Sequence, residues 1–484
     1  MKLSDLSDVQ WFQRLSGRRS AKLQQINNMW AYYRGTQPLY YVARILSEQD
    51  ERFPALTINW CRKYVRSIDG RSLLEGFGYV GQDSLDDDMQ AIMLRNELDL
   101  NQSANNISTL VTGESYAIVG PSDEGALITI ESPESMAVEV DPRSRRPIGA
   151  VKFWRSDSLG AQTIEDQAVL LLPNSDGSGS RLVEFEYGKP VGEKKQQKWM
   201  AGPAKLQASP TIPVVPFYNN EWQGAGESQM LDLIPLVDAA NIVATSMMAS
   251  VLHHAMPRML ALNVAESLFM NEDGSVNREA VKQATGALWI VPAETDDKGN
   301  VPENAPEADI KQLPASDLRN FHDTLSNLAR IGAGLCDLTP SDFGFGISDN
   351  PPSAESINES KRERLLGIER FNRQQGSRYE QVMRIALAVE GKDPGKKLIR
   401  SEFRNPATPT KQSMADAAVK TYSEGISDLY QARVDYGYTA TQISSMERRE
   451  AAGEARQLTA AAAPLTAALR DGLSGNADAS ASGQ

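Results

Sequence analysis

The residues that most often carry metal or acid–base chemistry are scarce in this chain. Its 484 residues include three histidines and two cysteines. His253 and His254 are adjacent, so on a helix their side chains point about 100° apart and do not converge on one metal ion. We interpret them as polar groups of an interface. Cys61 lies on the apolar face of a predicted helix, which favours a small buried hydrophobic group. Two cysteines exclude a disulfide scaffold and favour a reducing compartment.

Sequence motifs for catalysis and cofactor binding are absent. The chain contains no G-x-x-x-x-G-K-[ST], no G-x-S-x-G and no H-E-x-x-H. The string GAG at residues 332–334 lacks the third glycine of a dinucleotide-binding fingerprint. Three consecutive acids, Asp86 to Asp88, either bind a cation or begin a helix, and we favour the helix start because the helix dipole stabilises negative charge there. The sequence therefore predicts no catalytic residue, no cofactor and no metal ligand.

The net charge and its distribution restrict the possible partners. A formal charge of −13 and a pI near 5.0 argue against a protein that grips nucleic acid on a broad basic face. Residues 82–142 hold thirteen acids against Arg95 alone, while residues 361–400 hold eleven Lys or Arg against five acids. The N-terminus has no apolar signal segment, and the uncharged run 239–257 is too polar for a membrane span. We therefore expect an intracellular protein or assembly and no membrane contact.

The apolar periodicity predicts helices at both ends of a β-rich insertion. Helices are expected from about residue 11 to Gly35 and over 57–74. From Ser115 the period changes to two, which predicts short strands within a β-rich insertion of about 115–218. These strands are expected at 115–120, 126–131, 136–141, 148–154, 168–172 and 182–187, with 213–217 closing the insertion. A helix packed on several sides is expected over 230–262, and a strand over 287–292.

Two further helices flank a loop rich in Gly and Pro. Leu318, Phe321, Leu325, Leu328 and Leu335 are spaced by three, four, three and seven, which indicates side-by-side helix packing. The loop 337–352 contains Phe343, Phe345, Asp337, Asp342 and Asp349, without Lys or Arg. Ser353 then caps a helix that continues to about Glu390 and would span about 57 Å. Residues 412–456 are expected to be helical, and the Ala-rich tail is disordered by composition.

Four strings resemble, in this order, sequences of portal proteins from long-tailed (siphovirus-type) bacteriophages. They are WAYYRGTQPLYY at 30–41, NWCRKYVRSIDGR followed by GFGY at 59–79, PVVPFYNN at 213–220 with LIPLVDAANIV at 233–243, and LTPSDFGFGISDNPPSAESI at 338–357. Together they cover about residues 25–455. The acidic stretch 82–100 and the Ala-rich tail match nothing in this pattern.

The resemblance implies an α+β, predominantly helical fold of the portal type with one very long helix. The family order is wing, stem helix, clip, stem helix, tunnel loop, long helix and crown. Mapped onto this chain, it gives a wing at 1–225, stem helices at 226–262 and 315–336, a clip at 263–314, a tunnel loop at 337–352, the long wing helix at 353–391, a crown at 392–460 and a disordered tail at 461–484.

The resemblance also implies a function and partners. It implies a non-enzymatic dodecameric ring at one capsid vertex of the virion, assembled in the host cytoplasm, that forms the channel for packaging and ejection of dsDNA. Such a ring nucleates head assembly with the major capsid and scaffold proteins and docks the terminase and then the head–tail adaptor. An acidic protein suits this task, because many cationic phosphate contacts would hold DNA tightly where it must slide.

Two groups of residues are predicted to serve this function, and each has an alternative interpretation. The loop residues Asp337, Asp342, Phe343, Phe345 and Asp349 would face the channel, or belong to a hinge loop buried against the wing. The stripe of Leu318, Phe321, Leu325 and Leu328 would pack the stem, within the subunit or against a neighbour. For the whole protein, the alternatives are a structural virion protein without a channel and an enzyme with an unrecognised site.

Overall fold

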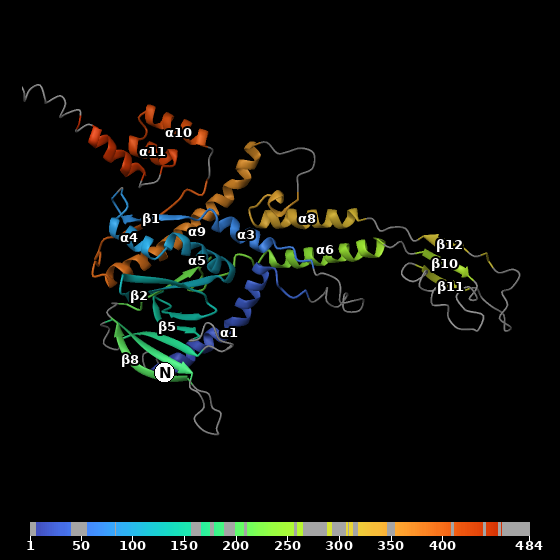
Figure 1. Cartoon of the computed structure of the whole chain (residues 1–484), viewed down its shortest axis with the longest axis horizontal. Helices are drawn as coiled ribbons and strands as arrows, with labels where there is room; N and C mark the ends of the chain where they lie inside the picture. The colour runs from blue at the N-terminus through green and yellow to red at the C-terminus, as the bar shows by residue number, and fades with distance from the viewer. Residues whose placement is uncertain are drawn as a thin grey trace, which may run out of the picture.

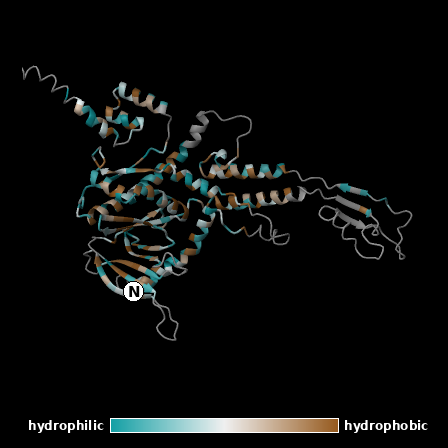
Figure 2. Cartoon of the chain, in the orientation of Figure 1, coloured by the Kyte–Doolittle hydropathy of each residue, from teal (hydrophilic) through white to brown (hydrophobic). Residues whose placement is uncertain are grey.

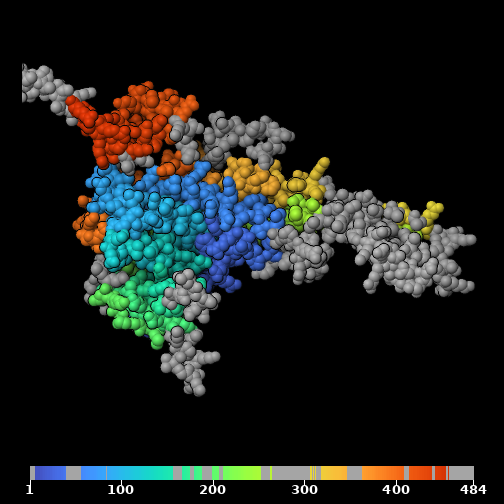
Figure 3. Space-filling view, in the orientation of Figure 1, coloured from blue at the N-terminus to red at the C-terminus, as the bar shows by residue number. Residues whose placement is uncertain are grey.

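The computed structural model describes residues 6–39, 56–82, 84–155, 166–174, 179–187, 199–207, 211–255, 259–264, 288–292, 306–307, 309–312, 318–345, 354–407, 411–438, 442–453 and 456. Helices and sheets form a body, from which two long helices project side by side and carry a small sheet at their far end (Figure 1). The space-filling view shows the N-terminal helices and the β-rich insertion packed in one continuous mass (Figure 3). We call α6 and α8 the helix pair, and β10 to β12 the tip sheet.

The N-terminal helices of the body begin and end where local signals place them. Helix α1, Asp8–Arg34, starts with a capping box between Ser7 and Gln10, and Gly35 ends it in the left-handed conformation at φ 75°. Helix α4, Asp87–Arg95, is capped by Asp86, whose carboxylate accepts from the Met89 amide at 3.1 Å. The acidic triad is thus a helix start, as predicted. Helices α3, Trp60–Asp69, and α5, Leu98–Thr112, complete this layer.

Two antiparallel sheets form the β-rich insertion. The five-stranded sheet has the order β4-β5-β6-β7-β8 and the three-stranded sheet the order β3-β2-β9. All seven predicted strands of the insertion are present, whereas β8 was not predicted. The strands are β2 (Glu114–Ser122), β3 (Gly125–Glu131), β4 (Met136–Val140), β5 (Pro147–Trp154), β6 (Gln167–Pro173), β7 (Ser180–Tyr187), β8 (Trp199–Gln207) and β9 (Val214–Tyr218).

A strand pair corrects one sequence-based boundary. The helix predicted over 57–74 ends at Asp69, and the chain continues as β1, Leu74–Tyr79. Its antiparallel partner is β13, Ile399–Phe403, which lies in the range expected for the crown. Glycine is required in β1 because a Cβ on Gly78 would lie 2.9 Å from the carbonyl oxygen of Ser84. A pairing of residues more than 300 positions apart leaves no local periodicity to detect.

The long helix α9, Ala354–Val389, runs through the body and agrees with the predicted long helix. Its buried Tyr379 lies against Phe217 of β9, with ring centroids 4.8 Å apart. Strand β13 packs so closely on α9 that a Cβ on Gly376 would lie 2.4 Å from the Ser401 hydroxyl oxygen. Gly367, by contrast, faces open space, since a Cβ there would meet no atom within 4 Å.

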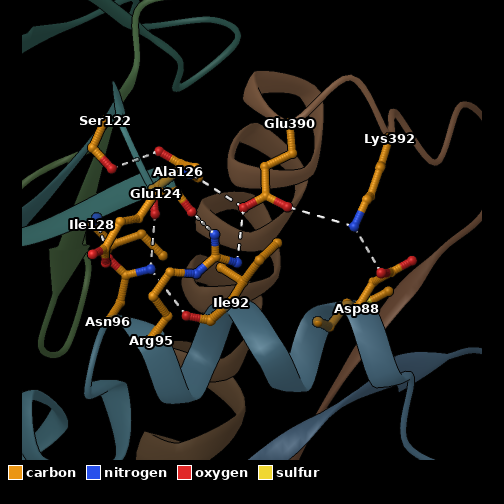
Figure 4. A network of polar contacts seen from close by, with 12 residues as sticks. Asp88, Ile92, Arg95, Asn96, Ser122, Glu124, Ala126, Ile128, Glu390 and Lys392 are labelled. Carbon is orange, nitrogen blue, oxygen red and sulfur yellow. Dashed lines mark hydrogen bonds and ion pairs between the residues drawn. The ribbon is translucent and has the colours of Figure 1, made fainter.

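A polar network fastens the C-terminal end of α9 to α4 (Figure 4). Glu390 accepts from Arg95 at 3.0 Å and from the Ala126 amide at 3.2 Å, and Lys392 reaches Asp88 at 2.7 Å. Asn96 also ties α4 to β3, because its side chain accepts from the Ile128 amide at 2.7 Å. The acidic stretch 82–100, whose role was open from the sequence, thus contributes the cap of α4 through Asp86 and one ion pair to this network through Asp88. We call the network of Arg95, Glu390, Lys392 and Asp88 the clamp.

In the helix pair, the observed helix ends differ from those predicted from the sequence. Helix α6 covers Ile234–Ala255 and ends before the predicted residue 262, since Met259–Val264 form strand β10. In the tip sheet β10 is parallel to β11, Leu288–Pro292, and antiparallel to β12, Asp309–Gln312, which was not predicted. Helix α8, Arg319–Leu335, returns to the body beside α6.

The last described segments are short helices outside the body (Figure 1). Helices α10, Lys411–Ser423, and α11, Leu429–Tyr436, pack on each other, and residues 442–453 are also helical. The tail at 461–484 lies outside the described residues.

Candidate functional site at the base of the helix pair

The seam between α6 and α8 is built from small residues more than from the predicted leucine stripe. Leu325 is buried, as predicted, and Leu328 packs partly against the same hydrophobic cluster, whereas Leu318 and Phe321 are half-buried. The remaining buried positions of α8 are Ala329, Gly332 and Ala333. On the side of α6 this cluster contains Leu233, Val237, Ala240 and Ala244.

Gly332 shows why the seam requires small side chains. A Cβ at this position would lie 3.3 Å from both the Leu233 Cδ1 and the Phe343 Cε2 atoms. Leu335, the last leucine of the stripe, takes no part in this seam within the subunit, because its side chain is 54% exposed. A single straight helix follows a period of 3.6, so its buried face passes from Leu325 through Ala329 to Ala333 and leaves the strict heptad position. The string ARIGAG at 329–334 was the available signal for this seam.

The first part of the predicted tunnel loop is folded against the body. Pro340–Phe343 form a 3-10 turn, and Thr339 and Asp342 cap it. The carboxylate of Asp342 accepts from the Thr339 amide at 3.1 Å and from its hydroxyl at 2.8 Å, and lies 3.7 Å from the Lys63 ammonium. Burial by itself would raise the pKa of Asp342. The hydrogen bonds from Thr339 to the carboxylate outweigh this effect and hold the pKa below its usual value.

The two loop aromatics contact Trp60 of α3. The Phe343 ring centroid lies 5.1 Å from that of Trp60 and the Phe345 centroid 6.3 Å. Phe343 is buried and Phe345 is half-buried. The sequence offered no signal for a contact across nearly 300 residues. Asp337 is exposed with φ 51°, and Asp349 lies outside the described residues. Whether this loop faces a channel stays a prediction.

Polar contacts attach α6 to the N-terminal helices of the body. The Tyr32 hydroxyl donates to the carboxylate of Asp238, with oxygen–oxygen distances of 3.0 and 2.9 Å. The side-chain oxygen of Asn241 accepts from the Ile58 amide at 2.6 Å. These contacts hold one face of α6 against α1 and the segment before α3. They fix the angle at which the helix pair leaves the body.

Both cysteines lie in this junction as buried, unpaired thiols. Cys61 is fully buried and Cys336 is 3% exposed. Burial raises the pKa of each thiol to about 12, with a further contribution from Asp238 for Cys61 and from Cys61 for Cys336. Both are therefore protonated at neutral pH and act as packing groups, as predicted for Cys61. The side chains of His253 and His254 lie outside the described residues.

The arrangement offers helix packing and a constrained loop, without a cluster of reactive groups. Among the described residues, no group of three or more His, Cys, Asp or Glu is placed to hold a metal ion. Hydrophobic residues follow α6 along its length beyond the body (Figure 2). The site is thus suited to mechanical coupling between the helix pair, the loop and the body.

Comparison with known proteins identifies relatives for most of the chain. A family model described as phage portal protein, SPP1 Gp6-like, matches residues 13–429. The chain is 28% identical over 410 residues to the portal protein of Mycobacterium phage D29 and 27% identical to that of Mycobacterium phage L5. Each alignment covers 81% of this chain and 78% of the relative. A chain from the neck of an empty GTA particle superposes with a TM-score of 0.44 at 13% identity, covering 82% of this chain and 93% of that chain.

Proposed function

The chain belongs to the SPP1 Gp6-like family of phage portal proteins, whose members are structural, non-enzymatic virion components, and we propose that it forms a dodecameric ring at one vertex of a phage capsid. The ring nucleates head assembly with the major capsid and scaffold proteins, docks the terminase, passes dsDNA and then holds the head–tail adaptor. In this proposal the body corresponds to the wing, the helix pair to the stem and the tip sheet to the clip.

The observation that carries the ring is the incomplete burial of α6. The segment Ile234–Val251 is apolar enough, by length and composition, for a membrane-spanning helix, yet only 28% of it is buried in the subunit. The sequence-based exclusion of a span considered residues 239–257, a window that lacks the apolar residues at 234–237. We favour burial against neighbouring subunits, because Asp238 and Asn241 bind one face of this segment to the body. Placing such polar groups in lipid would be energetically costly.

The exposed face of α8 supports the same conclusion. Ile331 and Leu335 lie one turn apart and are 53% and 54% exposed, away from the seam with α6. A head-to-tail ring interface joins two different surfaces of neighbouring subunits. The apolar flanks of α6 and α8 are such surfaces, and each would be covered in a closed ring.

The ring is tested by imaging and mass measurement on the purified full-length protein. Negative-stain images should show a closed ring with a central hole, and native mass spectrometry should give twelve subunits of 53.0 kDa. A monomer at micromolar concentration, in buffers from low to high salt, would contradict the proposal. A hydrolase and nuclease screen on the same preparation should find no activity.

The passage of DNA is tested separately through the charge of the predicted tunnel loop. Asp349→Lys would add one cation per subunit to the proposed constriction, and the resulting phosphate contacts would slow the duplex. We expect rings and empty heads to form while DNA packaging falls. Asp349→Asn is the matched control, since it removes the negative charge without adding a cation. Normal yields of filled heads from the Lys variant would exclude this loop from the DNA path.

A further inference from the structure

A cavity of about 210 Å³ lies where α3, the end of α8 and α9 meet. Its wall includes Tyr64 from α3, Asp337 after α8, and Arg364 and Arg370 from α9. Two arginines and one aspartate thus line a small space in a protein whose net charge is −13, with Arg364 half-buried and Arg370 and Asp337 exposed.

Arg364 is the most buried of these charged residues, and its charge is only partly compensated. It is half-buried, and one terminal nitrogen donates to the Ser67 carbonyl at 2.9 Å. Its Nε is buried and has no hydrogen-bond partner among the described residues. Burial, and then the nearby Arg71, lower the pKa of Arg364, while Asp342 and Asp337 act in the opposite direction. Asp342 is already engaged by Thr339 and Lys63, so it offsets this cation only in part.

Other residues of the cavity wall carry hydrogen-bond donors. Arg364 and Arg370 lie on one side of α9 with Gly367 three residues from each, and a Cβ on Gly367 would enter open space. Tyr64 accepts from the Gln229 side-chain nitrogen at 2.7 Å, and burial raises its pKa to about 12. The phenol therefore keeps its proton at neutral pH and can donate it in a hydrogen bond.

We propose that this cavity binds a single oxyanion, either a phosphate ion or the carboxylate of an acidic side chain from a second copy of the chain. Guanidinium groups bind both through paired N–H donors, and the free Nε of Arg364 would gain a partner. A DNA duplex is too wide to bring its phosphates into so small a space. The side-chain source rests on the proposed ring, whereas the phosphate source does not.

The first test compares phosphate with chloride at matched ionic strength on the unassembled full-length chain. Phosphate should raise the melting temperature by about 2–4 °C, because a ligand that binds only the native state stabilises it. The rise should disappear in Arg370→Gln. Arg373→Gln is the matched control on the same helix, since this side chain is 83% exposed and does not line the cavity. An equal rise in wild type, Arg370→Gln and Arg373→Gln would overturn the proposal.

A second variant places the ligand group in the cavity by covalent attachment. Gly367→Glu would extend a carboxylate between Arg364 and Arg370, whereas Gly367→Gln has the same size without the charge. We expect the Glu variant to melt higher than the Gln variant in chloride and to lose its response to phosphate. A Glu variant that responds to phosphate like wild type would show that the cavity does not hold the anion.

The source of the oxyanion is decided by repeating the titration on assembled rings. If a neighbour's carboxylate fills the cavity, phosphate should stabilise free subunits only and should shift the equilibrium away from rings. If the ligand is phosphate itself, rings and subunits should respond alike. Either outcome supports the site. Failure of wild type to form rings would remove the proposed function but leave the response of the free subunit to phosphate as evidence for the cavity.

Discussion

The body and the helix pair bury their hydrophobic residues to very different extents. In the body, Tyr379 of α9 is fully buried against Phe217, and its hydroxyl accepts from the Asn105 side chain at 3.0 Å. In the helix pair, only the side of α8 facing α6 and the body is buried, while Ile331 and Leu335 remain exposed. The core around Tyr379 is therefore closed within one subunit, although the surface of the body keeps exposed hydrophobic residues such as Leu127 and Leu206. Helix α8 is packed on one side only. Substitutions in the two regions should separate folding from assembly.

The largest loss of stability should come from a charge placed in the seam of the helix pair. Leu325→Asp buries an unpaired carboxylate, which costs roughly 3–5 kcal/mol and is comparable with the whole stability of many domains. Ile331→Asp places the same charge on the exposed face of α8. We expect the first variant to lose cooperative unfolding and the second to fold normally without forming rings.

Circular dichroism melting and size exclusion with light scattering check both results. Rings from Ile331→Asp would show that the exposed face of α8 is no interface. A cooperative, stable Leu325→Asp variant would show that the seam is looser than its burial indicates.

The next effect concerns the loop that joins the helix pair to the body. Phe343→Ala should lower the free energy of unfolding by about 3–5 kcal/mol, because it removes a buried ring packed on Trp60. Phe345→Ala should cost less, since this side chain is only half-buried. Chemical denaturation of both variants gives the difference. Equal, small losses would mean that neither ring is held in place by its contact with Trp60.

Substitution of the two glycines of α9 by alanine should change the free energy of unfolding in opposite directions. Gly376→Ala forces a methyl group toward Ser401 and should destabilise the body by about 1–3 kcal/mol. Gly367→Ala meets no atom within 4 Å and should stabilise the helix by about 0.5–1 kcal/mol. Denaturant midpoints measure both. Two changes of the same sign would show that close approach does not decide the role of these residues.

A smaller effect is expected at the clamp between α4 and α9. Arg95→Gln leaves the carboxylate of Glu390, 10% exposed, without its guanidinium partner and should cost about 1–2 kcal/mol. Lys392→Gln breaks a pair with Asp88 whose side chains are 46% and 59% exposed, and a longer contact of 3.6 Å with Glu390, so it should cost less than Arg95→Gln. Melting at low and high salt distinguishes them. A loss from Lys392→Gln as large as that from Arg95→Gln would contradict this order.

The smallest effect should be on thiol reactivity in the folded protein. Thiolate is the reactive form, so labelling normally accelerates as the pH rises toward the pKa of a free thiol. With the pKa of both thiols at about 12, labelling should stay slow from pH 7 to pH 9 and become fast only on unfolding. A disulfide-exchange reagent followed by absorbance measures this rate. Rapid labelling at pH 8 would reveal that the junction between the body and the helix pair opens.

Features fixed by near neighbours were accessible from the sequence. Ser7 and Gln10 cap α1, Gly35 ends it, and Asp86 begins α4, because each requires only hydrogen bonds within one helical turn. The strands of the insertion followed from alternation of apolar residues, and the length of α9 from its helical period. The family could also be identified from local strings, since they reflect short segments in a fixed order.

Features that depend on distant residues were decided by the tertiary structure alone. Strand β1 exists because β13 pairs with it, and Phe343 is buried because α3 brings Trp60 to the loop. The seam passes to Ala329 and Ala333 and leaves Leu335 exposed because the face of α8 that is buried depends on where α6 lies. Local hydrogen bonds can be predicted from neighbouring residue types, but burial depends on which distant surface the folded chain brings into contact.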